Sequence, residues 1–161
     1  MRAVAFQEQP EIRVDGERLV NTGAIPAKGG TLLGLEAAGN RRNVYVAGEF
    51  FHYALERDSG CGVCVSAPNP NFSGWYLMAS WILTGETKTY LPYALNNNMA
   101  TFANPRPNAP FAFDGKHWGA WEIAARYSDL DLDWRAGTPG AACGGGCVRG
   151  GEQRIWTLGL N

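Results

Sequence analysis

The stretch that decides the fold is Asn71–Gly85, NFSGWYLMASWILTG. Its side chains alternate between two faces, one with Trp75, Leu77, Ala79, Trp81 and Leu83, the other with Tyr76, Met78, Ser80, Ile82 and Thr84. A period of two is typical of a β-strand, and this one far exceeds the usual length of about 5–6 residues. Trp75 and Trp81 would stand about 20 Å apart along a strand, close to the roughly 25 Å apolar band between the aromatic girdles of a membrane β-barrel.

The same alternation recurs along the chain. It predicts six strands, at Pro10–Gly16, Thr31–Gly39, Val44–Leu55, Asn71–Gly85, His117–Asp133 and Glu152–Asn161, with Glu17–Gly30 as a connection and a tight turn at Asn40–Asn43. At least four of them are as long as the 9–11 residues that cross a bilayer. The sequence therefore predicts an all-β protein, an antiparallel meander forming part of a transmembrane β-barrel. A β-sandwich core lined with aromatic residues gives the same alternation and is the alternative fold.

Strand alternation also predicts which side chains face a lumen. In His117–Asp133, Trp121, Ile123 and Tyr127 share one face, which we expect to face lipid together with the tryptophans of Asn71–Gly85. Glu122 and Arg126 share the opposite face. Because charge is costly on the lipid face, we expect the lumen face to carry Glu49, Glu122 and Arg126.

Composition excludes several classes of protein. The 161 residues are 45% hydrophobic, which is enough for a folded domain. The formal net charge is −1, so no basic field for nucleic acid is present. The longest apolar run, Trp75–Leu83, is too short for a transmembrane helix.

The four cysteines form two close pairs in loops, Cys61/Cys64 and Cys143/Cys147. Such spacing can bind zinc, but neither pair has a neighbouring histidine. We expect disulfide bonds in exposed loops, which form in an oxidising compartment, and no metal.

Catalysis is not indicated by any motif. No HExxH, nucleotide-binding glycine pattern or Ser/His/Asp motif occurs, so we expect neither an enzyme nor a cofactor. Asp129, Asp131 and Asp133 could suggest calcium, but they lack the glycine and distant glutamate of an EF-hand loop. A solvated acidic strand end is the simpler interpretation.

Four blocks of the sequence carry a family resemblance: FSGWYLMASWILTGETKTY, NPRPNAPF, HWGAWEIAARYSDLDL and WTLGLN. In order and spacing they resemble the phosphate-selective porin family, porins O and P, over about residues 10–161. The resemblance implies a trimeric bacterial outer-membrane channel of about 16 strands, in contact with outer-membrane lipid and passing inorganic anions such as phosphate. It implies that residues 1–161 form a partial barrel domain, truncated at both ends.

The resemblance also implies that the segment 86–116 folds into the lumen. Pro105 and Pro107 flank Arg106 and restrict its backbone, and guanidinium binds phosphate in a bidentate manner. We expect Arg106, with Lys88 and Lys116, to favour anions. The alternatives are an Arg106 on a periplasmic surface turn and, for the whole chain, a soluble β-sandwich that binds carbohydrate through its tryptophans.

Overall fold

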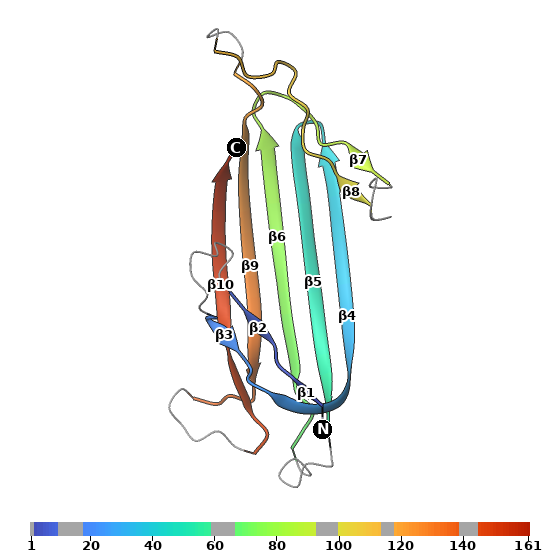
Figure 1. The fold of residues 1–161 in the computed structure, drawn as a ribbon, viewed down its shortest axis with the longest axis vertical. Coiled ribbons are helices and arrows are strands. Elements are labelled where there is room, and N and C mark those ends of the chain that lie inside the picture. The colour runs from blue at the N-terminus through green and yellow to red at the C-terminus, as the bar shows by residue number, and fades with distance from the viewer. Residues whose placement is uncertain (1, 10–17, 59–66, 93–99, 114–117, 139–144) are drawn as a thin grey trace. The chain divides into compact units, whose positions relative to one another are not determined.

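The computed structural model describes residues 2–9, 18–58, 67–92, 100–113, 118–138 and 145–161, and this part of the chain is all β (Figure 1). Its strands are β1 (Ala3–Val4), β2 (Gln7–Glu8), β3 (Val20–Asn21), β4 (Ile25–Arg41), β5 (Val44–Arg57), β6 (Asn71–Ile82), β7 (Tyr90–Leu91), β8 (Thr101–Phe102), β9 (Glu122–Trp134) and β10 (Val148–Leu160). The predicted strand at Pro10–Gly16 lies outside the described residues. Within the described ranges, no helix is long and apolar enough to cross a membrane.

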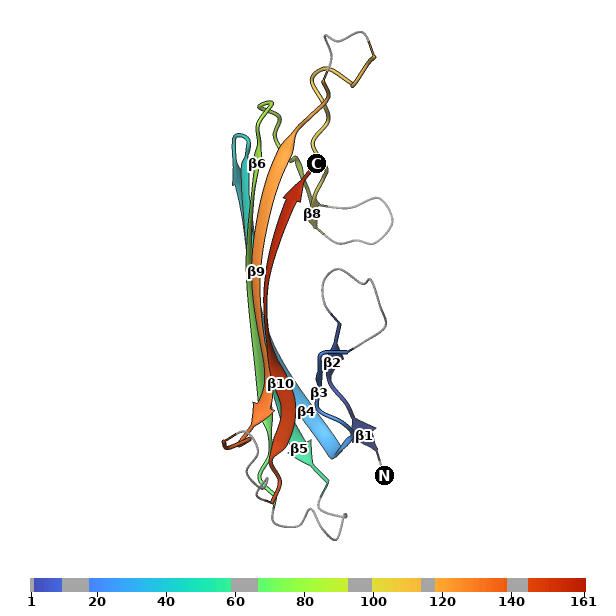
Figure 2. The ribbon, with the colours of Figure 1, turned by 90° about the vertical axis from the view of Figure 1, so that its left-hand side faces the viewer.

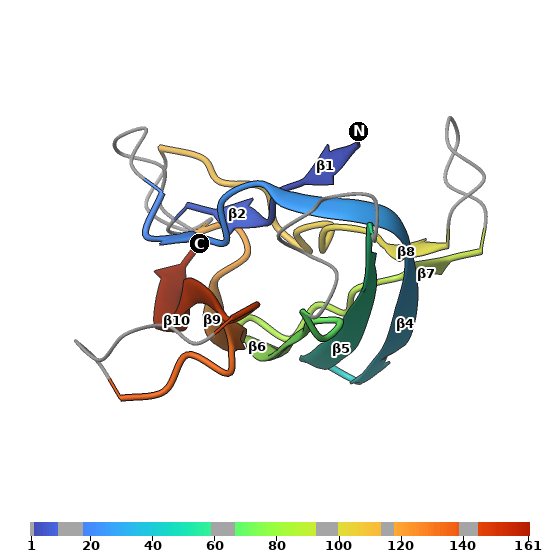
Figure 3. The same ribbon diagram turned by 90° about the horizontal axis from the view of Figure 1, so that it is seen from below.

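Six strands form one antiparallel sheet in the order β1-β4-β5-β6-β9-β10. The long strands follow one another in chain order, as Figure 3 shows, which confirms the predicted meander. They contain 12 to 17 residues each, more than the 9–11 residues that cross a bilayer. Among the described strands there is no second large sheet to complete a sandwich, and these lengths favour part of a barrel.

The start of β4 differs from the prediction. Glu17–Gly30 was expected to be a connection, but the strand already begins at Ile25. Pro26 weakened the strand pattern because proline lacks an N–H group, yet proline is tolerated near the start of a strand or at a sheet edge. Here Pro26 pairs with Ala3 of the two-residue strand β1. The sixth strand of the sheet is therefore β1.

The starts of β9 and β10 also differ from the prediction. β9 begins at Glu122 rather than His117, and Gly119, with φ of 74°, places a left-handed residue just before it. β10 begins at Val148 rather than Glu152. Its first four residues include Gly150 and Gly151. Glycine has no side chain that would mark one face of a strand, so the alternation is not visible in this part of the sequence.

The chain divides into two compact units, which we describe separately. The first comprises Met1–Glu36, Glu49–Tyr76 and Tyr127–Ile155. Its core is a cluster of buried apolar side chains: Val20, Ile25, Ala27, Leu55, Phe72, Leu132 and Val148. Val20 belongs to the β2–β3 pair, which lies off the plane of the long strands (Figure 2). Val20 packs against one face of the strands in this unit, and we call this face, along each strand, the covered face.

The second unit comprises Ala37–Gly48, Leu77–Arg126 and Trp156–Asn161. On its strands the covered face carries Ala47, Ser80, Ile82 and Glu122, all buried. The opposite, exposed face carries large apolar side chains: Val44, Val46, Leu77, Trp81, Ile123, Trp156, Leu158 and Leu160. This division follows the alternation that the sequence predicts for β6 and β9.

The alternation is broken in the first half of β10. In β10, Val148 and Gly150 are buried, and the next buried residue is Gln153 rather than Glu152. Gly151, between them, has φ of 88°, and its N–H donates a 2.8 Å hydrogen bond to Oδ1 of Asp133. These are the features of a β-bulge with glycine in the left-handed region, and the bulge shifts the rest of β10 by one residue.

Candidate functional site

A buried ion pair joins the segment after β6 to the covered face of the second unit. Nζ of Lys88 lies 2.8 Å from Oε1 of Glu122, and their side chains are only 14% and 10% exposed. The same ammonium lies 5.4 Å from the ring centroid of Tyr45 in β5, within the range of a cation–π interaction. Asn40 donates its side-chain amide to the carbonyl of Lys88. Lys88 is thus fixed to three long strands.

The aromatic side chains of the segment pack beside this ion pair. Tyr90 pairs with Phe102 in the two-stranded β7–β8 sheet, and their ring centroids lie 5.2 Å apart. The Phe102 ring also lies 5.0 Å from the ring of Tyr45. Tyr45 shares the covered face of β5 with the buried Ala47. The β7–β8 sheet therefore packs against the covered face rather than away from it.

A second attachment is centred on Glu86, a carboxylate that is 6% exposed. Its Oε1 accepts a 3.0 Å hydrogen bond from the backbone N–H of Asn108, and its Oε2 accepts one from the Thr84 hydroxyl. Oγ1 of Thr84 in turn accepts a 3.1 Å bond from the N–H of Trp121. The Asn108 bond, with the Thr84 bond, lowers the pKa of Glu86 below its usual value, because both bonds favour the ionised form.

Arg106 lies two residues before Asn108, whose backbone N–H is bound by Glu86. Pro105 and Pro107 flank it, and Asn108 follows. Arg106 is exposed, and no ion pair is found for it within the described ranges. The arrangement presents a charged guanidinium on a stretch of backbone that is attached to the ends of β6 and β9.

The predicted site residues thus separate into different roles. Lys88 and Glu122 are brought together, and each neutralises the other. Arg126 is half-buried on the same face of β9 as Glu122, and Glu49, in the first unit, is half-buried on the covered face of β5. Lys116 lies outside the described residues.

Sequence reasoning missed the role of Glu86. Its partner Asn108 is 22 residues away and donates its backbone N–H rather than a side-chain group. Because every residue except proline has this N–H, the sequence gives no sign of the contact. The available signal is the sequence Thr84-Gly85-Glu86, which lies within the first block of the family resemblance. Gly85 has φ of 93°, which allows the chain to turn Glu86 back toward Thr84.

In the first unit, Arg57 connects the two loops that carry the cysteines. Its Nε donates to the carbonyl of Pro68 at 2.9 Å, and its Nη2 donates to the carbonyl of Gly146 at 2.6 Å. The next residue, Cys147, is disulfide-bonded. Cys61, Cys64 and Cys143 lie outside the described residues, so their predicted disulfides stay a prediction.

The acidic residues of β9 are occupied by the protein itself. Asp129 binds Arg154 at 3.0 Å, Asp131 accepts the N–H of Asp133 at 2.8 Å, and Asp133 accepts that of Gly151. In the part of the chain that the structure describes, no group of three or more His, Cys, Asp or Glu is placed to hold a metal ion.

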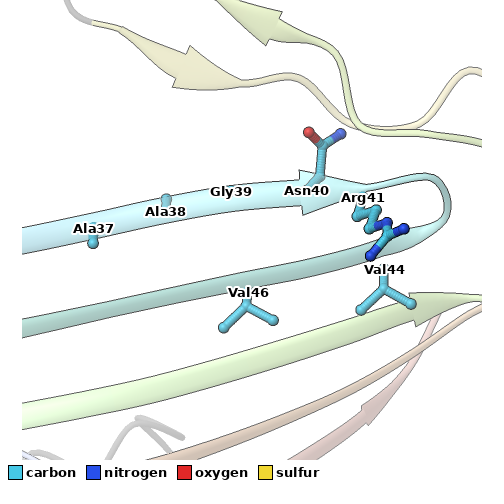
Figure 4. A pocket seen from close by; sticks show the side chains of 7 residues that line it. All are labelled: Ala37, Ala38, Gly39, Asn40, Arg41, Val44 and Val46. Atoms are coloured by element: carbon cyan, nitrogen blue, oxygen red, sulfur yellow. The ribbon is translucent and has the colours of Figure 1, made fainter.

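A shallow hollow lies at the β4–β5 turn of the second unit. Figure 4 shows Ala37, Arg41, Val44 and Val46 on the same side of the hairpin, with Asn40 pointing the other way. Val44 and Val46 are on the exposed face. The hollow is therefore separate from the ion pair and from the Glu86 attachment.

Comparison with known proteins gives two findings. The family model described as phosphate-selective porin O and P matches residues 1–161. A protein of Caulobacter vibrioides, described as uncharacterized, is 28% identical over 155 residues, which cover 96% of this chain and 26% of that protein. The chain thus spans about a quarter of the length of this relative. No solved structure matches the chain.

Proposed function

Because the chain belongs to the phosphate-selective porin O and P family, we propose that it forms part of the wall and the constriction of an outer-membrane channel for anions. The observation that carries this proposal is the attachment of the segment after β6 to the covered face, through the buried pair of Lys88 and Glu122. A segment held on the lumen side of a barrel wall narrows the channel.

The two faces of the sheet support this orientation. Leu77, Trp81 and Ile123 are exposed on one face, and large exposed apolar side chains are suited to contact with lipid. The covered face carries Glu122 and the attached polar segment. In a barrel it would face the lumen, where polar side chains meet water.

Arg106 supplies the anion preference in this proposal. Lys88 cannot contribute much, because Glu122 balances its charge at 2.8 Å. Arg106 is exposed, stays charged at physiological pH, and offers the planar donors that bind phosphate in pairs. Phosphate or polyphosphate is therefore the proposed substrate class, and transport is passive, without catalysis.

We propose that the channel is formed by a longer protein. The large sheet in the described part of the chain has six strands, fewer than the eight of the smallest common membrane barrels, and open sheet edges are costly in lipid. We propose a barrel of about 16 strands in the bacterial outer membrane, assembled as a homotrimer.

The test is to replace Arg106 in the full-length protein and to measure reversal potentials across a planar bilayer in a salt gradient. Arg106→Glu should shift the reversal potential toward cation permeability. The matched control is Arg41→Glu, which makes the same charge change at an exposed residue of the β4–β5 turn and should leave the reversal potential unchanged. An unchanged potential in Arg106→Glu would place Arg106 on a surface outside the ion path.

A third variant separates anion preference from phosphate binding. Arg106→Lys keeps the charge but loses the bidentate donor geometry. It should keep the reversal potential and weaken the block of chloride current by inorganic phosphate. Block of wild-type strength in Arg106→Lys would mean that Arg106 does not select phosphate.

A further inference from the structure

We propose that Glu86 is a positioning residue that sets the anion preference of the channel by holding Arg106 in place. The inference rests on the proposed function and extends it to a carboxylate that would not touch the permeating ion. It concerns an acidic residue that increases the preference for anions, which is the reverse of what its own charge would do.

The first support is the path from Glu86 to Arg106. Oε1 of Glu86 binds the N–H of Asn108 at 3.0 Å, two residues after Arg106. Pro107 lies between them and Pro105 precedes them, and each proline fixes its own φ near −65°. Few soft dihedrals therefore remain between the anchored N–H and the guanidinium-bearing residue, so the position of Asn108 determines where Arg106 lies.

The second support is the path from Glu86 to the sheet. Oε2 of Glu86 accepts the Thr84 hydroxyl, and Thr84 accepts the N–H of Trp121 at 3.1 Å. The carbonyl of Trp121 accepts the N–H of Leu83 at 2.8 Å. Glu86 is therefore fixed to the point where β6 ends and β9 begins, which is a rigid support for the segment.

The third support is that both carboxylate oxygens of Glu86 are already engaged. The side chain is buried, and its oxygens accept from Asn108 and Thr84. Lys88 is the cation nearest to Glu86 in the sequence, but it pairs with Glu122. Both oxygens that carry the negative charge of Glu86 thus accept hydrogen bonds from groups within the protein.

Positioning and direct charge effects predict opposite signs. If Glu86 acted only through its field, its replacement by alanine would raise the anion-to-cation permeability ratio. If it holds Arg106, the same change releases the 105–108 stretch and lowers that ratio. Glu86→Gln removes the charge but keeps an oxygen that can accept the N–H of Asn108, so it should preserve the ratio or raise it.

The experiment uses the full-length porin in planar bilayers with a potassium chloride gradient. We compare wild type, Glu86→Ala, Glu86→Gln, Arg106→Ala and the double variant Glu86→Ala/Arg106→Ala. Glu86→Ala should lower the permeability ratio toward that of Arg106→Ala, Glu86→Gln should not, and the double variant should match Arg106→Ala. A raised or unchanged ratio in Glu86→Ala, or a double variant in which the two effects add, would overturn the proposal.

One further variant and a comparison of the outcomes keep the test decisive. If Glu86→Ala does not fold, Asn108→Pro removes the donor and leaves Glu86 intact, and it should lower the ratio in the same way; a wild-type ratio would overturn the proposal. If Arg106→Ala leaves the ratio unchanged, the proposed function fails. If Arg106→Ala lowers it and Glu86→Ala does not, only the positioning role fails.

Discussion

The indole ring of Trp75 and the phenol ring of Tyr127 pack against each other across β6 and β9, with centroids 5.2 Å apart. Two residues beyond Tyr127, on the same face, Asp129 binds Arg154. Leu77, two residues after Trp75 in β6, lies on the other side of the aromatic pair from Asp129 and is exposed. The aromatic pair therefore separates a charged surface from an apolar one, as interfacial aromatics do at the border of a bilayer.

The exposed face can be tested by placing an arginine on either side of β6. Leu77→Arg puts a charge on the exposed face and should lower the free energy of unfolding from a bilayer by about 2–4 kcal/mol. Met78→Arg, one residue further on the opposite face, should cost less. Chemical unfolding of the full-length protein in lipid vesicles measures both. Equal losses would contradict the assignment of the faces.

The pair of Lys88 and Glu122 should be sensitive to the loss of one partner. Lys88→Met leaves Glu122 buried without its cation, which should cost on the order of 3–5 kcal/mol of stability. Adding Glu122→Leu should recover much of that loss. The control is Lys28→Met: its contact with Glu56 is 3.9 Å long and both side chains are about 60% exposed, so its loss should cost under about 1 kcal/mol. Similar losses for the two lysines would refute the buried pair.

Gly74 is confined by its neighbours in the first unit. A Cβ there would lie 2.5 Å from Cζ of Phe51 and 3.2 Å from the carbonyl oxygen of Asp129. Gly74→Ala should therefore cost about 1–3 kcal/mol, and Phe51→Leu in the same chain should reduce that cost. Gly34→Ala, where a Cβ meets nothing within 4 Å, is the control and should be neutral or stabilising. The midpoint of urea unfolding reports all three.

Glu86 should make stability depend on pH in a defined direction. Its pKa in the folded state lies below the usual value of 4.5, so its contribution is complete above that value and is lost as pH falls through the lowered folded pKa. The stability difference between wild type and Glu86→Gln should be constant from neutral pH down to about 5 and shrink below about 4. A difference that grows on acidification would contradict the lowered pKa.

Cys147 should be protected from alkylation. Because it is disulfide-bonded, iodoacetamide should label it only after reduction, and Cys147→Ser should cost about 2–4 kcal/mol, as is typical for the loss of a disulfide. Peptide mass spectrometry of the labelled full-length protein measures this. Labelling of Cys147 in the unreduced protein would show that the bond does not form.

The sequence predicts the large sheet well because alternation accumulates over long strands. β5 and β6 begin at the residues expected, Val44 and Asn71. The errors in where strands begin fall where a glycine or proline interrupts the alternation: Pro26 in β4, Gly119 before β9 and Gly150 in β10. The ends of β4, β5 and β6 differ from the prediction by two or three residues. At these positions neighbouring strands decide the structure, and their pairing cannot be read from one segment alone.

The candidate site was less predictable than the sheet. Alternation places Glu122 on the covered face, but it cannot show that Lys88, 34 positions earlier, will be its partner. Nor can it show that Glu86 will bind a backbone N–H beyond the prolines. Both contacts depend on how an irregular segment folds back, which is set by many packing and hydrogen-bond contacts rather than by a period in the sequence.

The bulge at Gly151 has a consequence at the level of the gene. Deleting this one codon would remove the extra residue and restore regular alternation, because Gly150, Glu152 and Gln153 would then follow one another on the covered, exposed and covered faces. Trp156, Leu158 and Leu160 would therefore stay exposed. Deleting the Arg154 codon, which also preserves the reading frame, would instead turn these three side chains to the covered face, although almost every amino acid is retained.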